Sequence, residues 1–526
     1  MAKRLIIALS LTVFLISCGK ENKKKENTTE ISIVREKQIA QFSMDCNPET
    51  LDPRRAHDLK SINMIQLTYE GLTRMQDTGK ISPGVAKRVS VSDDGCIYTF
   101  YLHECTWSNQ DPITSKDFEL TWKSILNDDV VCPSKHLFFV IKNAKNIAEK
   151  TAPLDDLAVR CIDEKTLEVT LEHPCAYFPN LVACHAFFPI HNTLRDNKDT
   201  TQRISNGPFT ADMNDKKLIL KKNNQYLDKH KILLDEVHFF VVENNQALKL
   251  FETGKLDWVG FPCMSMPQEN LLHITQTKHL KSCQVAKLFY LQINCNNQYM
   301  KNINLRKAFC QALDKKSIGT DILGSLHETQ NTQLPTLQGT AYGFEDTEKL
   351  LKTSLTELGI HQSDLQSLTL VYCNEEAQFR EIAEKIQSNY KRVFSLDITP
   401  IPCSAREYNE KKASGDYSLL ITSTTCDFLD QSCYLEAVSK VPGWHNERYL
   451  SLLSKADFEI DSSKRIDLLE KAHKILLEDV PIVPLFQGTY TYLKNDDLTN
   501  AKVTPLGFLD LRYAHFKWNQ KPFREQ

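Results

Sequence analysis

Residues 92–122, SDDGCIYTFYLHECTWSNQDPITSKDFELTW, carry the clearest structural signal in this 526-residue chain. Asp93-Asp94-Gly95 is a turn signal, and the aromatic run 97–102 that follows is typical of a strand. Thr114 with Asp117 three residues later is a variant of the capping box that starts helices. Phe118, Trp122 and Ile125 then recur at helical spacing on one face. A strand followed by an amphipathic helix predicts an α/β fold.

The same alternation of strands and helices continues on both sides of this stretch. A chain of this length is too long for one hydrophobic core, so we expect two or three lobes with a ligand cleft between them. The expected strands are 237–242, 288–294, 368–372, 396–401 and 481–486. The expected helices are 62–72, one through 247–251, one through 305–313 capped by Asn304, 379–390 and 465–477.

Composition and motifs exclude several classes of protein. The formal net charge is -3, whereas a nucleic-acid-binding protein needs a clear basic excess. The chain has no GxSxG elbow, P-loop or HExxH helix, so we expect no enzyme. The alternative is an enzyme whose Cys–His nucleophile pair is hidden among sixteen cysteines and fifteen histidines.

The pattern of residues at the N-terminus is typical of an export signal. Lys3 and Arg4 precede an apolar run, 5–16, that is too short to span a bilayer. Cys18-Gly19 after that run resembles the lipobox of bacterial lipoproteins, so we expect a signal peptide at 1–17 and acylation of Cys18. The alternative is an ordinary secretory signal with an incidental cysteine. Residues 18–38 are polar and predict a disordered tether to the membrane surface.

The remaining fifteen cysteines leave at least one thiol without an intramolecular partner, and export favours disulfides. None has zinc-site spacing, so we expect no metal and no cofactor. The sequence alone does not show whether Cys96 forms a disulfide with Cys105, or Cys161 with Cys175. Such cysteines can also be free thiols that pack in the core like small hydrophobic side chains. A structural envelope protein, cross-linked through these cysteines, is a further alternative.

Short motifs along the chain resemble the family 5 solute-binding proteins, the peptide, dipeptide and nickel receptors of ABC importers. The motifs are 69–74 (YEGLTR), 83–86 (PGVA), 92–122, 206–209 (NGPF), 254–258 (GKLDW), 305–309 (LRKAF) and 481–486 (PIVPLF). The resemblance implies a three-lobed periplasmic binding protein fold, with two large α/β lobes around the cleft and a smaller inserted lobe. It implies lobe I at 39–70, 204–286 and 490–526, the inserted lobe II at 71–203, and lobe III at 287–489.

The resemblance also implies a function and a site. We expect the protein to capture short peptides and to deliver them to the permease subunits of an ABC importer. Asp427 would hold the peptide α-ammonium, with Asp430 as the competing candidate. Ser423, Thr424 and Thr425 would pair with the ligand backbone, and His57, Asp58 and Leu59 would form the facing ligand-pairing strand.

Departures from the family pattern leave the ligand open. Thr424 stands where the family has a tryptophan, which alters one side pocket. A dipeptide, a cell-wall peptide, a nickel chelate or haem is the alternative ligand. Cys283 and Cys426 would form a disulfide, and Arg306 would either reach the cleft or serve as an ion-pair partner. Trp107 and Trp122 are expected in the core.

Overall fold

The computed structural model describes residues 37–127, 130–196, 203–214, 217–266, 279–323 and 345–517. The chain divides into 1–37 and 38–526, and only the second unit is described below. The predicted signal peptide, Cys18 and nearly all of the tether lie outside the described residues. Gln38, the last residue of the predicted tether, belongs to the folded body, because it is buried and its N–H donates to Asp235 Oδ2 at 2.7 Å. Within the described ranges, no helix is long and apolar enough to cross a membrane.

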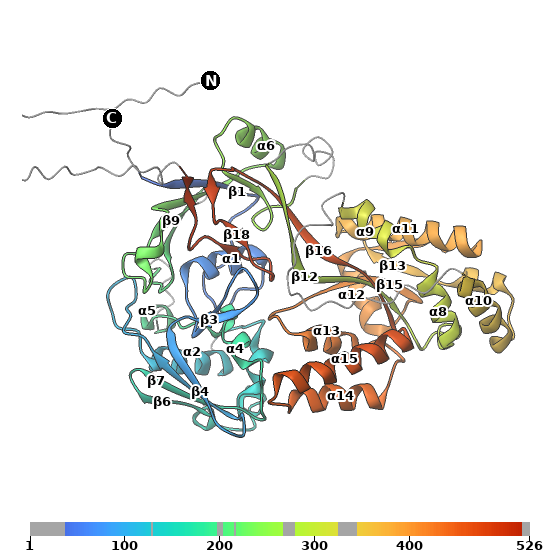
Figure 1. Ribbon diagram of the computed structural model, residues 1–526, viewed down its shortest axis with the longest axis horizontal. Coiled ribbons are helices and arrows are strands. Elements are labelled where there is room, and N and C mark those ends of the chain that lie inside the picture. The colour runs from blue at the N-terminus through green and yellow to red at the C-terminus, as the bar shows by residue number, and fades with distance from the viewer. Residues whose placement is uncertain are drawn as a thin grey trace, which may run out of the picture. The chain divides into compact units, whose positions relative to one another are not determined.

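One ten-stranded sheet runs through most of the body in the order β14-β13-β15-β12-β16-β11-β1-β10-β9-β8 (Figure 1). Its strands mix parallel and antiparallel neighbours, as the pairing of β1 with β10 and of β12 with β16 shows. The strands are β1 (Ile39–Met44), β8 (Phe209–Asn214), β9 (Lys217–Lys222), β10 (Glu236–Val241), β11 (Trp258–Gly260), β12 (Leu280–Ile293), β13 (Leu370–Cys373), β14 (Pro400–Cys403), β15 (Leu419–Thr425) and β16 (Ile482–Lys494).

The long strands β12 and β16 run side by side and join the two halves of this sheet. Their first segment pairs Leu280–Gln284 with Thr489–Leu493, and their second pairs Leu288 onward with residues up to Gln487. The register shifts between Gln284 and Leu288. A β-bulge of this kind bends a strand and increases its twist, so the sheet changes direction here.

A separate four-stranded antiparallel sheet, β4-β5-β7-β6, is packed by α2 and lies in the segment that follows β1 and α1 (Leu59–Thr68). The predicted strand 97–102 is confirmed as β5, and Asp117 accepts from the Thr114 N–H at 2.8 Å in the predicted capping box of α2. Trp107 and Trp122 are fully buried, as predicted. The elements are β2 (Thr73–Met75), β3 (Ile81–Pro83), β4 (Ala86–Val91), β5 (Ile97–Leu102), α2 (Ser115–Leu126), α3 (Ala144–Ala148), β6 (Val159–Asp163), β7 (Thr166–Thr170), α4 (Phe178–Leu181) and α5 (Asn192–Asp196).

The helices of the second half cover the β14-β13-β15 end of the large sheet (Figure 1). The predicted βαβ unit is confirmed, because β13 and β14 are parallel neighbours joined through α11. These helices are α8 (Ile303–Gln311), α9 (Lys315–Leu323), α10 (Glu345–Leu358), α11 (Ala377–Phe394), α12 (Ala405–Ser414), α13 (Gln431–Val438), α14 (Glu447–Asp457) and α15 (Ser462–Asp479). Helix α6 (Asn244–Glu252) lies instead against β11, toward the other end of the sheet. Short strand pairs β17 (Leu498–Thr499) with β20 (His515–Phe516), and β18 (Lys502–Val503) with β19 (Leu509–Asp510), follow β16.

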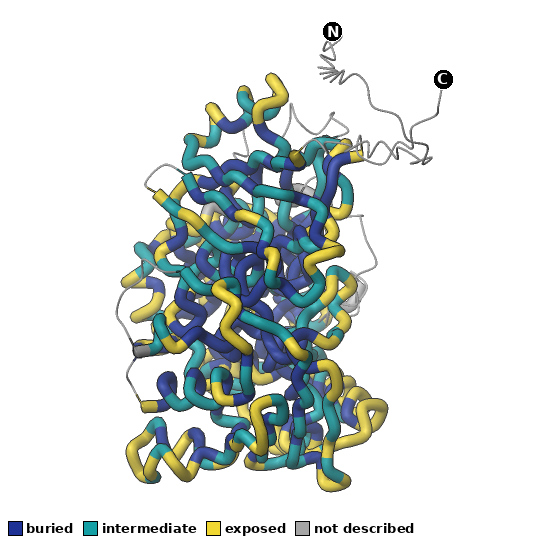
Figure 2. Tube along the Cα trace, turned by 90° about the vertical axis from the view of Figure 1, so that its left-hand side faces the viewer, coloured by how far each residue is buried: buried dark blue, intermediate teal, exposed yellow. Residues whose placement is uncertain are grey.

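Buried segments fill the interior of the body and exposed segments lie at its periphery (Figure 2). The buried hydrophobic residues form several separate clusters rather than one core. Phe100, Trp107 and Trp122 belong to the cluster of the four-stranded sheet. Phe42 and Trp258 stack at 5.4 Å in the cluster beneath β1 and β10. Two further clusters, separate from each other and from the first two, lie on opposite faces of β12 and β15. Several cores in one chain agree with the expectation from its length.

The motif Asn206-Gly207 marks the point where the chain returns beside the end of α1. The Gly207 N–H donates to the Thr68 carbonyl at 2.8 Å, and a Cβ at this glycine would lie 2.4 Å from the Thr68 carbonyl carbon. The Asn206 side chain accepts from the Glu70 N–H at 3.0 Å and donates to its carbonyl at 2.9 Å. Residue 207 must therefore be glycine for the two segments to cross so closely.

One predicted helix is present with different bounds, and two predictions about side chains are wrong. The helix predicted at 62–72 is α1 (Leu59–Thr68). Helix α8 is capped by Asn302, which accepts from the Leu305 N–H at 3.0 Å, whereas the predicted cap Asn304 donates to Glu357. Arg306 is buried, but its guanidinium donates to main-chain carbonyls, including that of Asp479 at 2.6 Å, and not to a carboxylate.

Candidate ligand-binding site

The C-terminal half of β15 has one open edge. On one side β15 pairs with β12, from Leu419 opposite Ile293 to Thr425 opposite Lys287. On the other side its pairing with β13 covers only Leu419 and Leu420. In the described residues, no strand pairs with Ser423–Thr425 along the edge of β15 that faces β13.

The hydrogen bonds of β15 tell which residues face that edge. The Cys426 N–H donates to the Ala286 carbonyl at 3.0 Å, toward β12. On the other side, the Ile421 carbonyl accepts from the Tyr408 hydroxyl at 3.0 Å. Because main-chain groups alternate along a strand, Ser423 and Thr425 turn their N–H and carbonyl groups to the open edge, whereas Thr424 bonds to β12. Of the three predicted pairing residues, two therefore offer main-chain groups to an incoming strand.

Asp427 follows directly after this edge and is about half exposed. Its Oδ2 lies 3.8 Å from Nε2 of His136, which comes from the segment before β6. Partial burial raises the pKa of the Asp427 carboxyl, and His136 acts in the opposite direction. An ion pair at this distance between half-exposed groups is weak, so the carboxylate has capacity for a second cation.

Asp427 also borders a small cavity, whose other walls come from the end of α1 and the segment after it, from residues 180–188 and from residues 504–512. The other charged groups that line this cavity are Glu70, Arg74, Asp510 and Arg512. Its volume is about 30 Å³, which is room for about one or two water molecules. A peptide therefore fits only after Asp427 and the facing wall move apart.

The charges of the facing wall already have partners. Arg74 donates to Asp228 at 2.9 Å and lies 3.6 Å from Glu70, which accepts from the Tyr226 hydroxyl at 2.6 Å. Arg512 and Asp510 form a bidentate pair at 2.8 and 2.9 Å. The two arginines hold the pKa of the buried Asp510 carboxyl below its usual value. Asp427 is thus the lining carboxylate with no arginine partner in the described structure.

Asp430, the competing candidate, is occupied. Its carboxylate accepts two hydrogen bonds from Arg465, at 2.7 and 2.8 Å, and one from the Ser432 N–H at the start of α13. A carboxylate with a bidentate arginine and a helix cap has little capacity left for a ligand. The geometry therefore favours Asp427.

The segment predicted as a ligand-pairing strand, His57-Asp58-Leu59, runs into the start of α1. Asp58 is the N-cap of α1, where its Oδ1 accepts from the Ser61 N–H at 2.9 Å, and Leu59 is the first residue of the helix. The last residue of the predicted strand is therefore helical, whereas His57 and Asp58 precede the helix. Contact between these three residues and a ligand through their side chains stays a prediction.

The predicted Cys283–Cys426 disulfide is absent from the described structure. Both thiols are free, as are the other thirteen cysteines of the described residues. Cys283 Sγ lies 3.3 Å from the Gln284 carbonyl and 3.5 Å from that of Val503. Burial raises the pKa of the Cys283 thiol to about 11, which keeps it protonated and unreactive.

The sequence did not predict that His136 lies beside the site, or that the charged groups Glu70, Arg74, Asp510 and Arg512 form its facing wall. Glu70 and Arg74 lie in a motif that was used only to describe the fold, and no local signal joins them to Asp510 and Arg512. His136 is an exposed residue of a short 3-10 helix. Only the folded chain brings Asp427 beside His136 and beside the cavity that Glu70, Arg74, Asp510 and Arg512 line.

A mixed ten-stranded sheet together with a separate four-stranded sheet is consistent with the fold of the extracellular solute-binding proteins. The chain belongs to the bacterial extracellular solute-binding proteins, family 5, whose profile matches residues 80–446. It is 31% identical to the oligopeptide-binding protein OppA of Bacillus subtilis, over 95% of this chain and 94% of that protein. It is 27% identical to the dipeptide-binding protein DppE of the same organism, over 97% of each.

The fold is also that of solved structures. The unliganded open form of the periplasmic murein tripeptide-binding protein MppA, a protein of Escherichia coli, superposes with a TM-score of 0.80 at 24% identity, covering 92% of this chain and 98% of that one. At this identity the likeness concerns the fold alone. The predicted α/β periplasmic binding protein fold is confirmed, and the family is one of solute-binding proteins rather than enzymes.

Proposed function

We propose that the protein captures short peptides outside the membrane and delivers them to the permease subunits of an ABC importer. The observation that carries this proposal is the open edge of β15 ending at Asp427. An extended peptide would add as a strand along Ser423 and Thr425, which gives affinity without regard to sequence. The relatives named for oligopeptide and dipeptide binding support the same class of ligand.

Asp427 would hold the α-ammonium of the peptide. A cation enclosed between lobes is costly unless a carboxylate pairs with it. Among the lining carboxylates, Glu70 and Asp510 already lie against arginines, whereas the ionic partner of Asp427 in the described part of the chain is the histidine His136. An ammonium at this position would favour the ionised form of Asp427 and so oppose the rise in its pKa caused by burial.

Opening and closing of the cleft would occur at the bulge of β12 and β16. The proposed boundaries of lobe III are residues 287 and 489. Residue 287 lies on β12, within the register shift between Gln284 and Leu288, and residue 489 lies on β16, opposite Gln284 at the edge of the same shift. Two strands with interrupted pairing form a hinge on which the lobes could rotate. A peptide that contacts both sides would stabilise the closed state through its contacts.

Export and anchoring complete the proposal. Removal of residues 1–17 and acylation of Cys18 would hold the protein on the outer face of the cell membrane, in the periplasm or at the cell surface. The tether would let the folded body reach the permease. Cys18→Ser should prevent acylation, whereas globomycin, which blocks lipoprotein signal cleavage, should leave an acylated precursor that still carries residues 1–17.

The first experiment is mass spectrometry of the ligand released on denaturing the purified protein. Mixed short peptides would support the proposal, whereas one defined small molecule or a metal chelate would replace it. Calorimetry then compares one peptide with a free N-terminus and the same peptide N-acetylated. Asp427→Asn should weaken binding of the free peptide by about 10-fold to 100-fold, the usual cost of a charged hydrogen bond, and leave the acetylated peptide unchanged.

The matched control is Asp467→Asn, which alters an exposed helical aspartate on α15 that pairs only with Lys471. It should bind both peptides as the unaltered protein does. Equal weakening of both peptides by Asp427→Asn would contradict the role of this carboxylate as the ammonium partner.

A further inference from the structure

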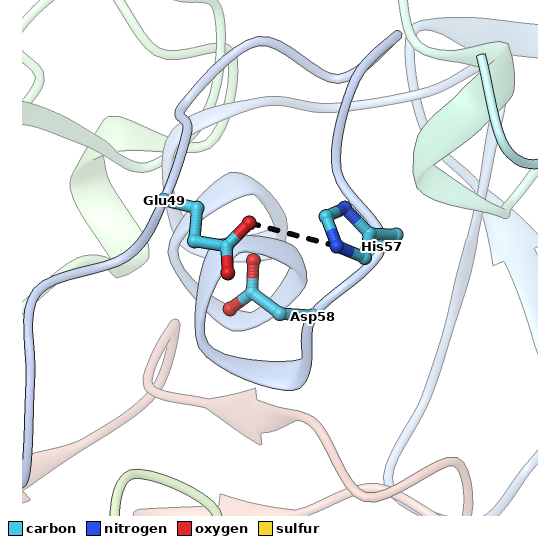
Figure 3. A group of neighbouring side chains, drawn as sticks. All are labelled: Glu49, His57 and Asp58. Carbon is cyan, nitrogen blue, oxygen red and sulfur yellow. Dashed lines mark ion pairs between the residues drawn. The ribbon is translucent and has the colours of Figure 1, made fainter. Parts of the chain in front are cut away.

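Three metal-ligating side chains converge where α1 begins (Figure 3). One atom from each of Glu49, His57 and Asp58 lies within 4.8 Å of the other two. The distance from His57 Nε2 to Glu49 Oε2 is 3.5 Å. Ligand atoms bonded to one tetrahedral zinc ion at about 2.0–2.1 Å lie a little over 3 Å apart. The three groups therefore need only small side-chain movements to share an ion.

Asp58 supplies the second observation. One carboxylate oxygen, Oδ1, caps α1 by accepting from the Ser61 N–H at 2.9 Å. The other, Oδ2, is buried, and no group in the described residues donates to it. A buried acceptor without a partner is unfavourable, and an ion beside it would remove that cost. The cap also fixes the carboxylate orientation, as outer contacts do for metal ligands.

The donor set indicates the kind of ion. Calcium and magnesium prefer oxygen ligands only, whereas zinc accepts one imidazole nitrogen together with carboxylate oxygens. Glu49 and His57 are more than half exposed, so an ion can enter from solvent. The positive end of α1 opposes a cation, but two carboxylates at shorter range outweigh one helix end.

We propose that Glu49, His57 and Asp58 form a binding site for a divalent ion of the zinc type. Three protein ligands leave at least one coordination position for water. The ligands come from a short segment between β1 and α1, and Asp58 belongs to α1 itself. Ion binding would therefore hold this segment against the start of the helix. The proposal does not depend on peptide capture.

The test is a cobalt titration of the full chain followed by absorption spectroscopy. Cobalt replaces zinc at such sites, and an N/O site gives d–d bands without the thiolate charge-transfer band that cysteine ligation produces. This difference separates the proposed site from the free cysteines. We expect one N/O-type equivalent, whose affinity falls by at least about tenfold in His57→Ala and in Asp58→Asn.

Asp58→Asn keeps the helix cap, because asparagine caps helices as well as aspartate does. In the absence of metal it should therefore unfold like the unaltered protein, and zinc should stabilise it less than it stabilises the unaltered protein and the control variants. The matched controls are Asp461→Asn, the same change at the N-cap of α15, and His230→Ala, an exposed histidine elsewhere. Cobalt bound only with thiolate character, or equal affinity in Asp58→Asn, would overturn the proposal.

Discussion

His185 is a histidine that the fold holds in its neutral form. It is 4% exposed, and its Nε2 lies 3.3 Å from the Ala56 carbonyl. Burial lowers the pKa of its imidazole to about 4. In the unfolded chain the same group has a pKa of about 6.5. The protonated form is therefore tolerated in the unfolded chain and disfavoured in the fold.

This pKa difference predicts a loss of stability in acid. Because the folded pKa is depressed, the contribution of His185 is complete above pH 6.5 and is lost as the pH falls toward 4. The difference corresponds to about 3 kcal/mol at most. In His185→Gln the free energy of unfolding should fall less between pH 7.5 and 4.5, by about 2–3 kcal/mol. Urea unfolding at both pH values measures this.

The exposed His230 provides the control for this measurement. His230→Gln should keep the acid dependence of the unaltered protein. If His185→Gln and His230→Gln show the same slope with pH, proton uptake at His185 does not drive the loss of stability.

Residue-level prediction from the sequence succeeded where a side chain acts on its near neighbours. Thr114 and Asp117 are three residues apart, and their capping box is present. Arg306 was expected to pair with a carboxylate, but it donates to carbonyls at the end of α15. Nothing in the local sequence shows which distant carbonyl groups remain unpaired at a helix end.

At the scale of elements, the strand β5 was predicted to the residue because turn, aromatic run and alternation agree. The helix start at Asp58 was missed because an ungapped comparison with the family assigned a strand there. Local chemistry gave the better answer, since Asp58 and Ser61 have the spacing of an N-cap and its N3 donor.

The open edge of β15 permits a prediction with an internal control. Proline removes a main-chain N–H, and it is tolerated on a strand only where that N–H makes no ladder bond. The Thr425 N–H faces the open edge, whereas the Thr424 N–H faces β12. Thr425→Pro should therefore fold normally and bind peptide at least tenfold more weakly, because one ligand hydrogen bond of about 1.5 kcal/mol is lost.

Thr424→Pro should instead lower the free energy of unfolding by about 3 kcal/mol or more, because it breaks the bond to β12. Denaturant unfolding and peptide titration of the two variants distinguish these outcomes. Unchanged affinity in Thr425→Pro would mean that the ligand does not add to this edge.

At the scale of the whole molecule, the order of motifs was sufficient to predict the family and the fold class, because each motif serves a packing role that the topology requires. The crossing of Gly207 over Thr68 is one such role. The site was less predictable, since Asp427, His136 and Glu70 come from distant parts of the chain. The cysteines were misjudged for a similar reason: export favours disulfides, but burial accounts for Cys283 and Cys426 as free thiols.

The separate cores predict how the body responds to heat and to ligand. The core of the four-stranded sheet, around Phe100 and Trp122, is distinct from those of the ten-stranded sheet. Without ligand, calorimetry should therefore resolve more than one unfolding transition. His136 is two residues before Phe138, which belongs to the core of the four-stranded sheet, whereas Asp427 follows β15 of the ten-stranded sheet. A peptide held at Asp427 would thus contact both parts and raise the midpoints of both transitions.

At a peptide concentration of about 100 times Kd, the added stability should be about 2.7 kcal/mol. Asp427→Asn at the same peptide concentration should show a much smaller rise, because its Kd is larger. A rise confined to the transition of the ten-stranded sheet would mean that the ligand contacts only the lobe of β15, and closure of the cleft would then not be part of capture. A rise in the midpoints of both transitions would mean that the bound peptide contacts both parts and so couples the unfolding of their separate cores.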